Sequence, residues 1–377
     1  MHRTKKILCV LLSVLMIASA MALAASAAQT DSEQLKFNAD GKFTILNFSD
    51  IQDRYPMKSI TKDLIKDTIA RVNPDLIVLT GDNISGGSVN TNTLARAAIR
   101  EFMQIFEDAG IPTAAVFGNH DNESLTATKE FQMSCYESYN CFVGCAGEDM
   151  SGCGTYNLPI LSSDGSRYAF NLWFTDSGTY NTENDLGGYA CVQKDQIEWY
   201  KAKSSELKAQ NNGNPVPSIN FQHIIVPEIF EALENTGSGY VLPEGAEGEL
   251  NENPCPPKYS NGQFAAFLEQ GDVLATVSGH DHVNTFKVNY KGIDIINTPG
   301  TGFYSYDSEV VGSRVFVLDE NEPENYETYC LSYFDIYSYD DDVARYRFKA
   351  NSDTTSNATK FAAMFKYIFA LIASIFK

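Results

Sequence analysis

Three continuous apolar runs in the first third of the chain alternate with two stretches whose apolar residues recur at helical spacing. The apolar runs lie within residues 42–50, 74–82 and 111–121, and the helical stretches are 59–73 and 93–110. Runs rich in Val, Ile and Leu are typical of strands buried on both faces, and strand–helix–strand alternation indicates parallel pairing. We therefore predict a parallel sheet covered by helices.

The second half of the chain is richer in consecutive strands. One helix is predicted at 193–210, and strands are predicted within 168–178, 218–224, 273–282, 285–292, 293–300 and 313–320. Such a succession suits two packed sheets better than one doubly wound sheet. The expected fold class is α/β, a two-sheet β-sandwich flanked by helices, in one domain over residues 38–345.

The first 28 residues have the order of a secretory signal peptide. A basic start is followed by an apolar run from Ile7 to about Ala25 and by a small-residue A-x-A motif that ends at Ala27. We expect residues 1–28 to be removed and the protein to be secreted or held in the cell envelope. The alternative is an uncleaved membrane anchor, although the run is near the lower length limit for a span.

The last segment, residues 346–377, is predicted to be a polar linker and an amphipathic helix. Residues 360–377 hold an apolar core flanked by Lys360, Lys366 and Lys377. This core is too short to span a bilayer comfortably. Two interpretations stay open: a helix that contacts a membrane surface, and a helix docked on the protein's own surface.

The charge balance excludes one class of partner. The chain carries 48 acidic and 28 basic residues, a net charge of −20 at pH 7. An acidic surface repels nucleic-acid phosphates and gains nothing from counterion release, so we expect no nucleic-acid polymer as a partner. A small anion in a locally positive pocket is compatible with this charge.

Seven cysteines follow the predicted signal peptide, and four of them cluster at positions 135, 141, 145 and 153. No histidine lies among these four, and the surrounding stretch is rich in Gly and Ser. In an exported chain this pattern favours disulfides over a zinc site. The pairing stays open. Because the number of cysteines is odd, at least one thiol is unpaired or joined elsewhere.

Five short segments place side chains that can bind metals at predicted strand ends or in the loops that follow. They are residues 49–53, 80–83, 118–121, the strand containing His223, and 278–282. Four of the five histidines of the chain fall in these segments. Because the functional groups of such sheets gather beyond the carboxyl ends of strands, we expect these side chains to meet at one site.

The ordered motifs SDIQD, TGDN, GNHD, NFQHI and SGHDH resemble those of the calcineurin-like metallophosphoesterase superfamily, over residues 43 to about 305. The sequences GNHDNES, TDSGTY, HIIVPE and SGHDHVNTF are similar to the subgroup that contains the yeast cell-cycle-regulator phosphatases and the plant purple-acid-phosphatase-like proteins. The resemblance implies a hydrolase that acts on phosphoric ester bonds through two metal ions.

Carried over by motif, the resemblance implies a first metal held by Asp50, Gln52, Asp82 and His282. It implies a second metal held by Asp82, Asn119, His223 and His280. Asp82 would bridge the pair, because two metals about 3.5–4 Å apart need a shared ligand. A hydroxide between the metals would attack phosphorus, His120 would stabilise the phosphoryl charge or protonate the leaving group, and Asp121 would orient His120.

Gln52 departs from the family pattern, in which most members have histidine at this position. An amide oxygen favours harder ions such as Mn²⁺, Mg²⁺ or iron over an ion that prefers nitrogen. The cofactors are expected to be two divalent ions among Mn, Fe, Zn and Mg, and which of these fills the first position stays open.

The function that follows is hydrolysis of small phosphoesters by an exported enzyme. The first alternative is a phosphodiesterase specific for a nucleotide or a lipid. The second is an inactive binding domain on the same fold, which only Gln52 favours, since inactive members usually lose histidines.

Overall fold

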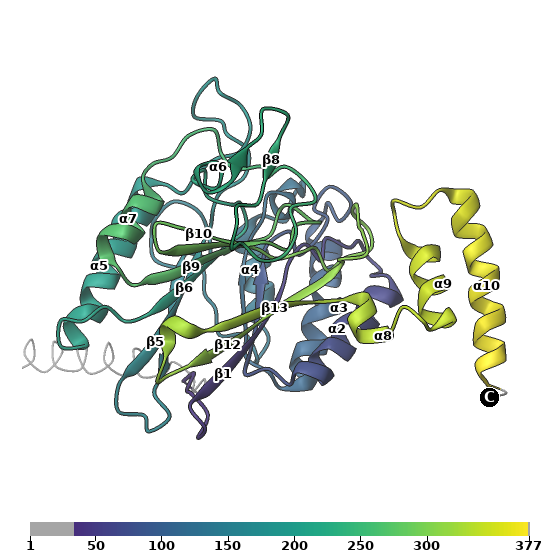
Figure 1. Cartoon of the computed structure of the whole chain (residues 1–377), viewed down its shortest axis with the longest axis horizontal. Coiled ribbons are helices and arrows are strands. Elements are labelled where there is room, and N and C mark those ends of the chain that lie inside the picture. The colour runs from purple at the N-terminus through teal and green to yellow at the C-terminus, as the bar shows by residue number, and fades with distance from the viewer. Residues whose placement is uncertain (1–33, 376–377) are drawn as a thin grey trace, which may run out of the picture. The chain divides into compact units, whose positions relative to one another are not determined.

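The structure is a computed structural model that describes residues 34–375, and its described elements belong to one unit that begins at Leu35. The predicted signal peptide, residues 1–28, lies outside the described residues. Two sheets and the helices on their outer faces make up this unit (Figure 1).

The first sheet has five strands in the order β13-β12-β1-β2-β3. Their bounds are Lys42–Phe48 for β1, Leu76–Thr80 for β2, Thr113–Val116 for β3, Gly312–Asp319 for β12 and Glu327–Ser332 for β13. Strands β1, β2 and β3 run parallel, as their apolar runs predict, whereas β12 is antiparallel to both β1 and β13. All residues of β2 and β3 are buried, which explains their apolar composition.

The second sheet has six strands in the order β10-β11-β9-β6-β5-β4. Their bounds are Tyr156–Leu161 for β4, Tyr168–Thr175 for β5, Ser218–Gln222 for β6, Val273–Ser278 for β9, Lys287–Tyr290 for β10 and Ile293–Asn297 for β11. The four central strands are parallel and the two edge strands antiparallel. A short hairpin, β7 (Glu234–Asn235) and β8 (Tyr240–Val241), lies outside this sheet.

The two sheets pack face to face, so the predicted two-sheet sandwich is confirmed. Phe221 of β6 contacts Phe316 of β12 edge to face, with ring centroids 5.8 Å apart, and Phe174 of β5 stacks on Phe221. These rings are fully buried within a cluster drawn from both sheets. A second cluster fills the space between the first sheet and its helices, and a third lies behind the second sheet.

Helices cover the outer faces of both sheets. The first sheet is covered by α2 (Ser59–Val72), α3 (Asn92–Ala109) and α4 (Lys129–Tyr136), the second by α5 (Lys194–Gln210) and α7 (Gln263–Gln270). Smaller elements are α6 (Ile229–Ala232), α8 (Tyr333–Tyr337), and the 3-10 turns η1 (His120–Glu123) and η2 (Pro323–Asn325). Helix α3 ends at Gly110, whose φ of 67° is a left-handed conformation that glycine adopts without a steric penalty.

The chain ends in two helices, α9 (Asp342–Asn351) and α10 (Asn357–Ile375). The predicted end of the domain at residue 345 falls inside helix α9. This helix packs through Ala344 and Phe348 on a small cluster that includes Phe303 and residues of α2. Helix α10 lies beside α9 (Figure 1).

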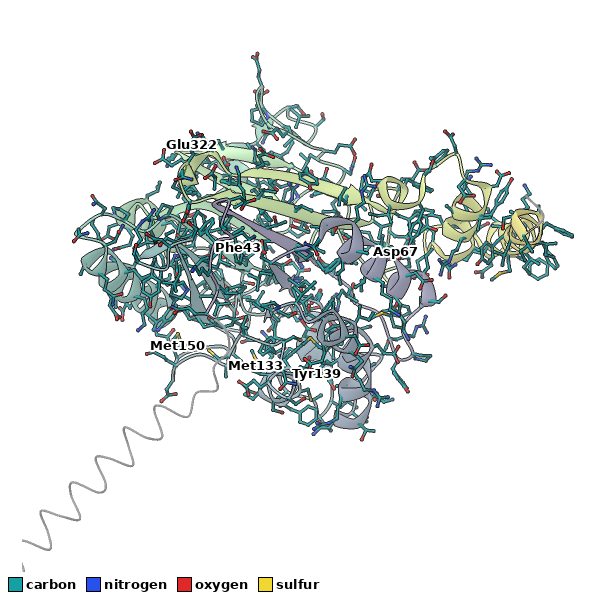
Figure 2. All side chains as sticks on the ribbon, turned by 90° about the horizontal axis from the view of Figure 1, so that it is seen from below. Phe43, Asp67, Met133, Tyr139, Met150 and Glu322 are labelled. Atoms are coloured by element: carbon teal, nitrogen blue, oxygen red, sulfur yellow. The ribbon has the colours of Figure 1, made fainter. Side chains whose placement is uncertain are left out.

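The predicted disulfides are absent from the described residues, in which all seven cysteines are free thiols. Three of the four clustered cysteines, Cys135 of α4 together with Cys141 and Cys153, pack as small apolar side chains in the same core cluster as Met133, which Figure 2 labels. Burial raises the pKa of both Cys141 and Cys153 to about 12, so these thiols stay protonated. Only Cys145 of the four is exposed. The other three are buried in the core, which is the physical reason that the cluster does not form disulfides at the surface.

Candidate metal centre

The carboxyl ends of strands from both sheets meet at one buried place. Asp50 follows β1, Asp82 follows β2, and His223 follows β6 of the second sheet. Oδ2 of Asp82 lies 3.2 Å from Nε2 of His223, and these two side chains are almost fully buried. The sandwich therefore joins residues that are far apart in the sequence, as the strand-end motifs predict.

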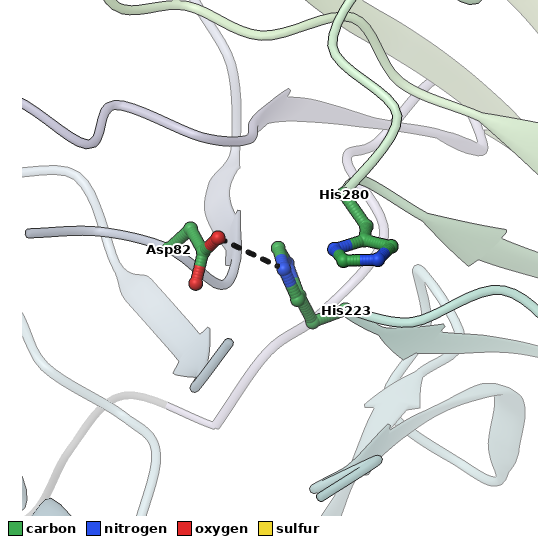
Figure 3. A group of neighbouring side chains, drawn as sticks. All are labelled: Asp82, His223 and His280. Carbon is green, nitrogen blue, oxygen red and sulfur yellow. Dashed lines mark ion pairs between the residues drawn. The ribbon is translucent and has the colours of Figure 1, made fainter. Parts of the chain in front are cut away.

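Asp82, His223 and His280 form one cluster in which the three ligand atoms lie within 4.8 Å of one another. Figure 3 shows the carboxylate of Asp82 beside the imidazole of His223, with His280 on the far side of that ring. Asn119 joins this group, because its Oδ1 lies 3.2 Å from Nε2 of His223 while its Nδ2 donates to the hydroxyl of Tyr180. These are the four ligands predicted for the second metal.

Asp50 and His282 form a neighbouring pair, with Oδ1 of Asp50 at 3.4 Å from Nε2 of His282. The other carboxylate oxygen of Asp50 accepts hydrogen bonds from the backbone N–H of His280 and from the hydroxyl of Ser49. Gln52 is buried and its backbone N–H donates to the carbonyl of Asp82 at 2.8 Å. The residues predicted for the first metal therefore adjoin those predicted for the second.

Four buried ligand atoms have no hydrogen-bond partner among the described residues: Oδ1 of Asp50, Oε1 of Gln52, Oδ2 of Asp82 and Nε2 of His280. Two of them, Oδ1 of Asp50 and Oδ2 of Asp82, lie at ion-pair distance from a histidine Nε2. An unpaired buried polar atom is costly, and native proteins leave few of them. Because all four can donate an electron pair, the site fits cations, and both predicted metal positions include two or more of these atoms.

Backbone carbonyls fix the orientation of two imidazoles. Nδ1 of His223 lies 2.9 Å from the carbonyl of Thr80, and Nδ1 of His282 lies 3.2 Å from that of Tyr306. A carbonyl only accepts, so each Nδ1 carries a proton and each Nε2 faces the site, where its electron pair can bind a cation once Nε2 has lost its own proton. This hydrogen bond from the far nitrogen is the usual support of a metal-binding histidine.

The electrostatics of the cluster also require a positive charge. Burial lowers the pKa of His223, but the Asp82 carboxylate outweighs it and raises the pKa to about 9. A proton therefore takes the place of a cation when none is bound. Burial and the charge of His223 together lower the pKa of His280 to about 3, so His280 stays neutral and keeps its electron pair.

Four of the predicted ligands adopt a left-handed backbone conformation. The φ angles are 48° at Asp50, 37° at Gln52, 47° at Asp82 and 72° at His280, which is half of the eight non-glycine residues with positive φ between residues 34 and 375. Such residues are uncommon and gather at functional sites that the surrounding fold holds in place. Gly81 is needed for a related reason, since a Cβ there would lie 2.7 Å from Nδ1 of His223.

His120 lies at the rim of the cluster and has a half-exposed side chain. Its backbone N–H donates to Oδ1 of Asp82 at 2.7 Å, which anchors it beside the ligands. The carboxylate that contacts its ring is Glu123, whose Oε2 lies 2.8 Å from Nδ1 of His120. Sequence reasoning missed Glu123, although its position three residues after His120 in a helical turn is a usable signal.

The orienting role that we predicted for Asp121 is therefore wrong, because Glu123 fills it. The carboxylate of Asp121 is fully buried and accepts from the backbone N–H groups of Ile84 and Gly118. Burial and the nearby charge of Asp82 raise its pKa to about 7. Asp121 thus holds together the two loops that carry Asp82 and Asn119.

Similarity to known proteins extends over the segments that carry this site. A family model described as calcineurin-like phosphoesterase matches residues 43–284. The chain is 30% identical over 318 residues to "Probable inactive purple acid phosphatase 14" of Arabidopsis thaliana, covering 76% of this chain and 77% of the relative. It is 27% identical over 347 residues to "Probable inactive purple acid phosphatase 29" of the same plant, covering 83% and 86%.

A solved structure has the same fold. A dimetal phosphatase from Danio rerio superposes with a TM-score of 0.50 at 14% sequence identity, covering 74% of this chain and 93% of that protein. The expected fold class is confirmed by this likeness together with the two packed sheets.

Proposed function

Because this chain belongs to the calcineurin-like phosphoesterase family, we propose that it hydrolyses phosphate esters with two divalent metal ions bound at the strand ends. The observation that carries the proposal is the set of four buried ligand atoms, one each in Asp50, Gln52, Asp82 and His280, that have no hydrogen-bond partner among the described residues. The names of the Arabidopsis relatives describe those proteins as probably inactive. Here each position that the family's metal motifs require holds a side chain able to bind a cation.

In this proposal the first metal is held by Asp50, Gln52, Asp82 and His282, and the second by Asp82, Asn119, His223 and His280. When bound, two such ions supply positive charge for a phosphate group and lower the pKa of a coordinated water. The carboxylates of Asp50 and Asp82 contribute two negative charges, so the loaded site keeps a net positive charge. A small phosphate dianion can therefore bind in a protein whose net charge is −20.

His120 is proposed to donate a proton to the leaving oxygen of the ester. Glu123 holds Nδ1 of its ring, which leaves Nε2 as the nitrogen available to the substrate. The hydrogen bond from the His120 backbone N–H to Asp82 holds this residue beside the ligands without making its ring a ligand. A positioned general acid of this kind contributes about 10²–10⁴-fold to a rate.

The test of the proposal is hydrolysis of p-nitrophenyl phosphate and of its bis-ester by the purified protein loaded in turn with Mn²⁺, Mg²⁺, Zn²⁺ and Fe²⁺. We expect metal-dependent turnover, with harder ions preferred because Gln52 offers oxygen. Preference for the bis-ester would favour the phosphodiesterase alternative. Elemental analysis that finds two metals without turnover would favour the inactive binding domain, and no bound metal at all would refute the proposal.

Replacing His120 with alanine is expected to lower kcat by about 10²-fold or more while leaving both metals bound, because a general acid is lost and no ligand is removed. The measurements are steady-state hydrolysis and elemental analysis of the same sample. Glu123→Gln keeps a hydrogen-bond acceptor for the ring and should cost less than His120→Ala. Full activity of His120→Ala would exclude the proton-donor role and leave the metal centre untouched.

A further inference from the structure

Helix α10 exposes a continuous apolar stripe. Its exposed large apolar side chains are Phe361, Met364, Phe365, Ile368, Phe369, Leu371, Ile372 and Ile375. Their exposed fractions run from 42% at Leu371 to 74% at Ile375. Most of these positions recur at intervals of three and four, so they share one face. A helix of a soluble domain normally turns such a face to the core, and an uncovered one marks an interaction surface.

The opposite face of α10 is the one that contacts the protein. Ala363 is its one buried residue among those described, and Tyr367 and Ala370 on the same side are half-buried. The ammonium group of Lys366 lies 5.3 Å from the ring of Tyr346 in α9. Figure 1 shows α10 lying beside α9, and Figure 2 shows it nearly end-on with side chains pointing away from α9. Helix α10 is therefore docked on the domain through one face, and this contact leaves its large apolar side chains uncovered.

Charge indicates what covers the stripe. Residues 357–377 contain three lysines and no acidic residue, in a chain with 48 acidic residues. A second copy of α10 would bring like charges together, whereas an anionic lipid surface offers both an apolar layer and negative headgroups. The combination of aromatic, aliphatic and lysine side chains fits such a surface.

We propose that α10 is an amphipathic anchor that lies in the plane of an anionic lipid surface. Its 19 residues are also long and apolar enough for a membrane span, by length and composition alone. Two observations favour the surface. Lys366 lies near the middle of the helix, where a span would place a charge in hydrocarbon, and the packing on α9 keeps one side of the helix against the domain.

The anchor is joined to the metal centre by a short chain of contacts. After α9, the hydroxyl groups of Ser352 and Thr354 donate to Oδ1 of Asp307, at 2.7 and 3.2 Å. The adjacent Tyr306 stacks on His282, with ring centroids 4.2 Å apart. The linker before α10 is thus tied to the domain next to a proposed ligand, and binding of α10 to lipid would hold the metal centre near that surface.

The test is co-sedimentation of the full mature chain with phosphatidylcholine vesicles prepared with and without phosphatidylglycerol. We expect binding to the anionic vesicles that falls as salt is raised, because screening weakens attraction between the lysines and the headgroups. Lys366→Gln should weaken binding by about fivefold, and Lys360→Gln should weaken it less, because Lys360 is already paired with Asp353. Phe365→Glu/Ile372→Glu should abolish it, and the matched control Leu186→Glu/Leu268→Glu, which changes exposed leucines elsewhere, should bind like the parent.

Circular dichroism checks that each variant is folded, and vesicle binding does not depend on whether the protein is an active enzyme. Equal partitioning of the parent and Phe365→Glu/Ile372→Glu would overturn the proposal. A second result would also overturn it: the parent does not bind vesicles but self-associates in analytical ultracentrifugation, and the double variant does not self-associate. The stripe would then be covered by a second copy.

Discussion

Asp82→Asn is expected to lower kcat/KM for p-nitrophenyl phosphate by roughly 10³-fold or more and to reduce bound metal from two ions to fewer than one. The carboxylate is the proposed bridge, and an amide offers one oxygen and no charge in its place. Several kcal/mol of transition-state stabilisation come from such metals, and each 1.36 kcal/mol is tenfold in rate. Asparagine also tolerates the left-handed backbone at this position, so the variant isolates the loss of charge.

Asp319→Asn is the matched control, because it removes a partly exposed carboxylate paired with Lys42 at the surface. It should retain both metals and full activity. Elemental analysis and steady-state kinetics on the same preparations decide the matter. An Asp82→Asn protein that binds two metals would show that Asp82 does not bridge them.

Lys129→Met is expected to lower the free energy of unfolding by about 3–5 kcal/mol, the usual cost of breaking a buried ion pair from one side. The ammonium group of Lys129 in α4 lies 2.8 Å from Oδ1 of Asp176, and both side chains are buried. Removal of the lysine leaves the carboxylate of Asp176 with backbone N–H donors from Cys153 and Gly178 but no counter-charge. Urea denaturation followed by circular dichroism measures the loss.

Lys42→Met removes the exposed partner of a surface pair and serves as the control. Its unfolding midpoint should stay at the parent value, because surface pairs contribute little. Equal midpoints for the two variants would show that the pair between α4 and the end of β5 does not stabilise the fold. A second variant, Lys129→Met/Asp176→Leu, should recover part of the loss, since no unpaired charge is then buried.

Most of the strands that could be predicted from the sequence are buried, although the edge strand β10 was predicted as well. Strands β2 and β3 are apolar runs because both of their faces are covered, and β1 is buried over most of its length. Strand β4 was missed because Pro159 interrupts its pattern, and it lies at the edge of its sheet, where proline is tolerated. Edge strand β13 was missed for a similar reason, as its residues are half-exposed and mostly polar.

The candidate site divides in the same way. The predicted ligands follow strands, and parallel strands deliver their ends to one edge, so the motifs were sufficient to bring them together. Glu123 was not predicted because its contact with His120 depends on the η1 turn rather than on a strand. The burial of Cys135, Cys141 and Cys153 was also invisible, since composition alone does not tell a core thiol from a surface one.

The left-handed backbone at the ligand positions limits how this centre could be redesigned. A library aimed at a different metal would gain little from β-branched residues at Asp50, Gln52 or Asp82, because their side chains clash in that conformation. Histidine, asparagine and aspartate are the ligands that the conformation accepts most readily. Gln52→His is thus the exchange that the backbone at this position favours, and we expect it to shift the metal preference of the proposed centre without rebuilding the loop.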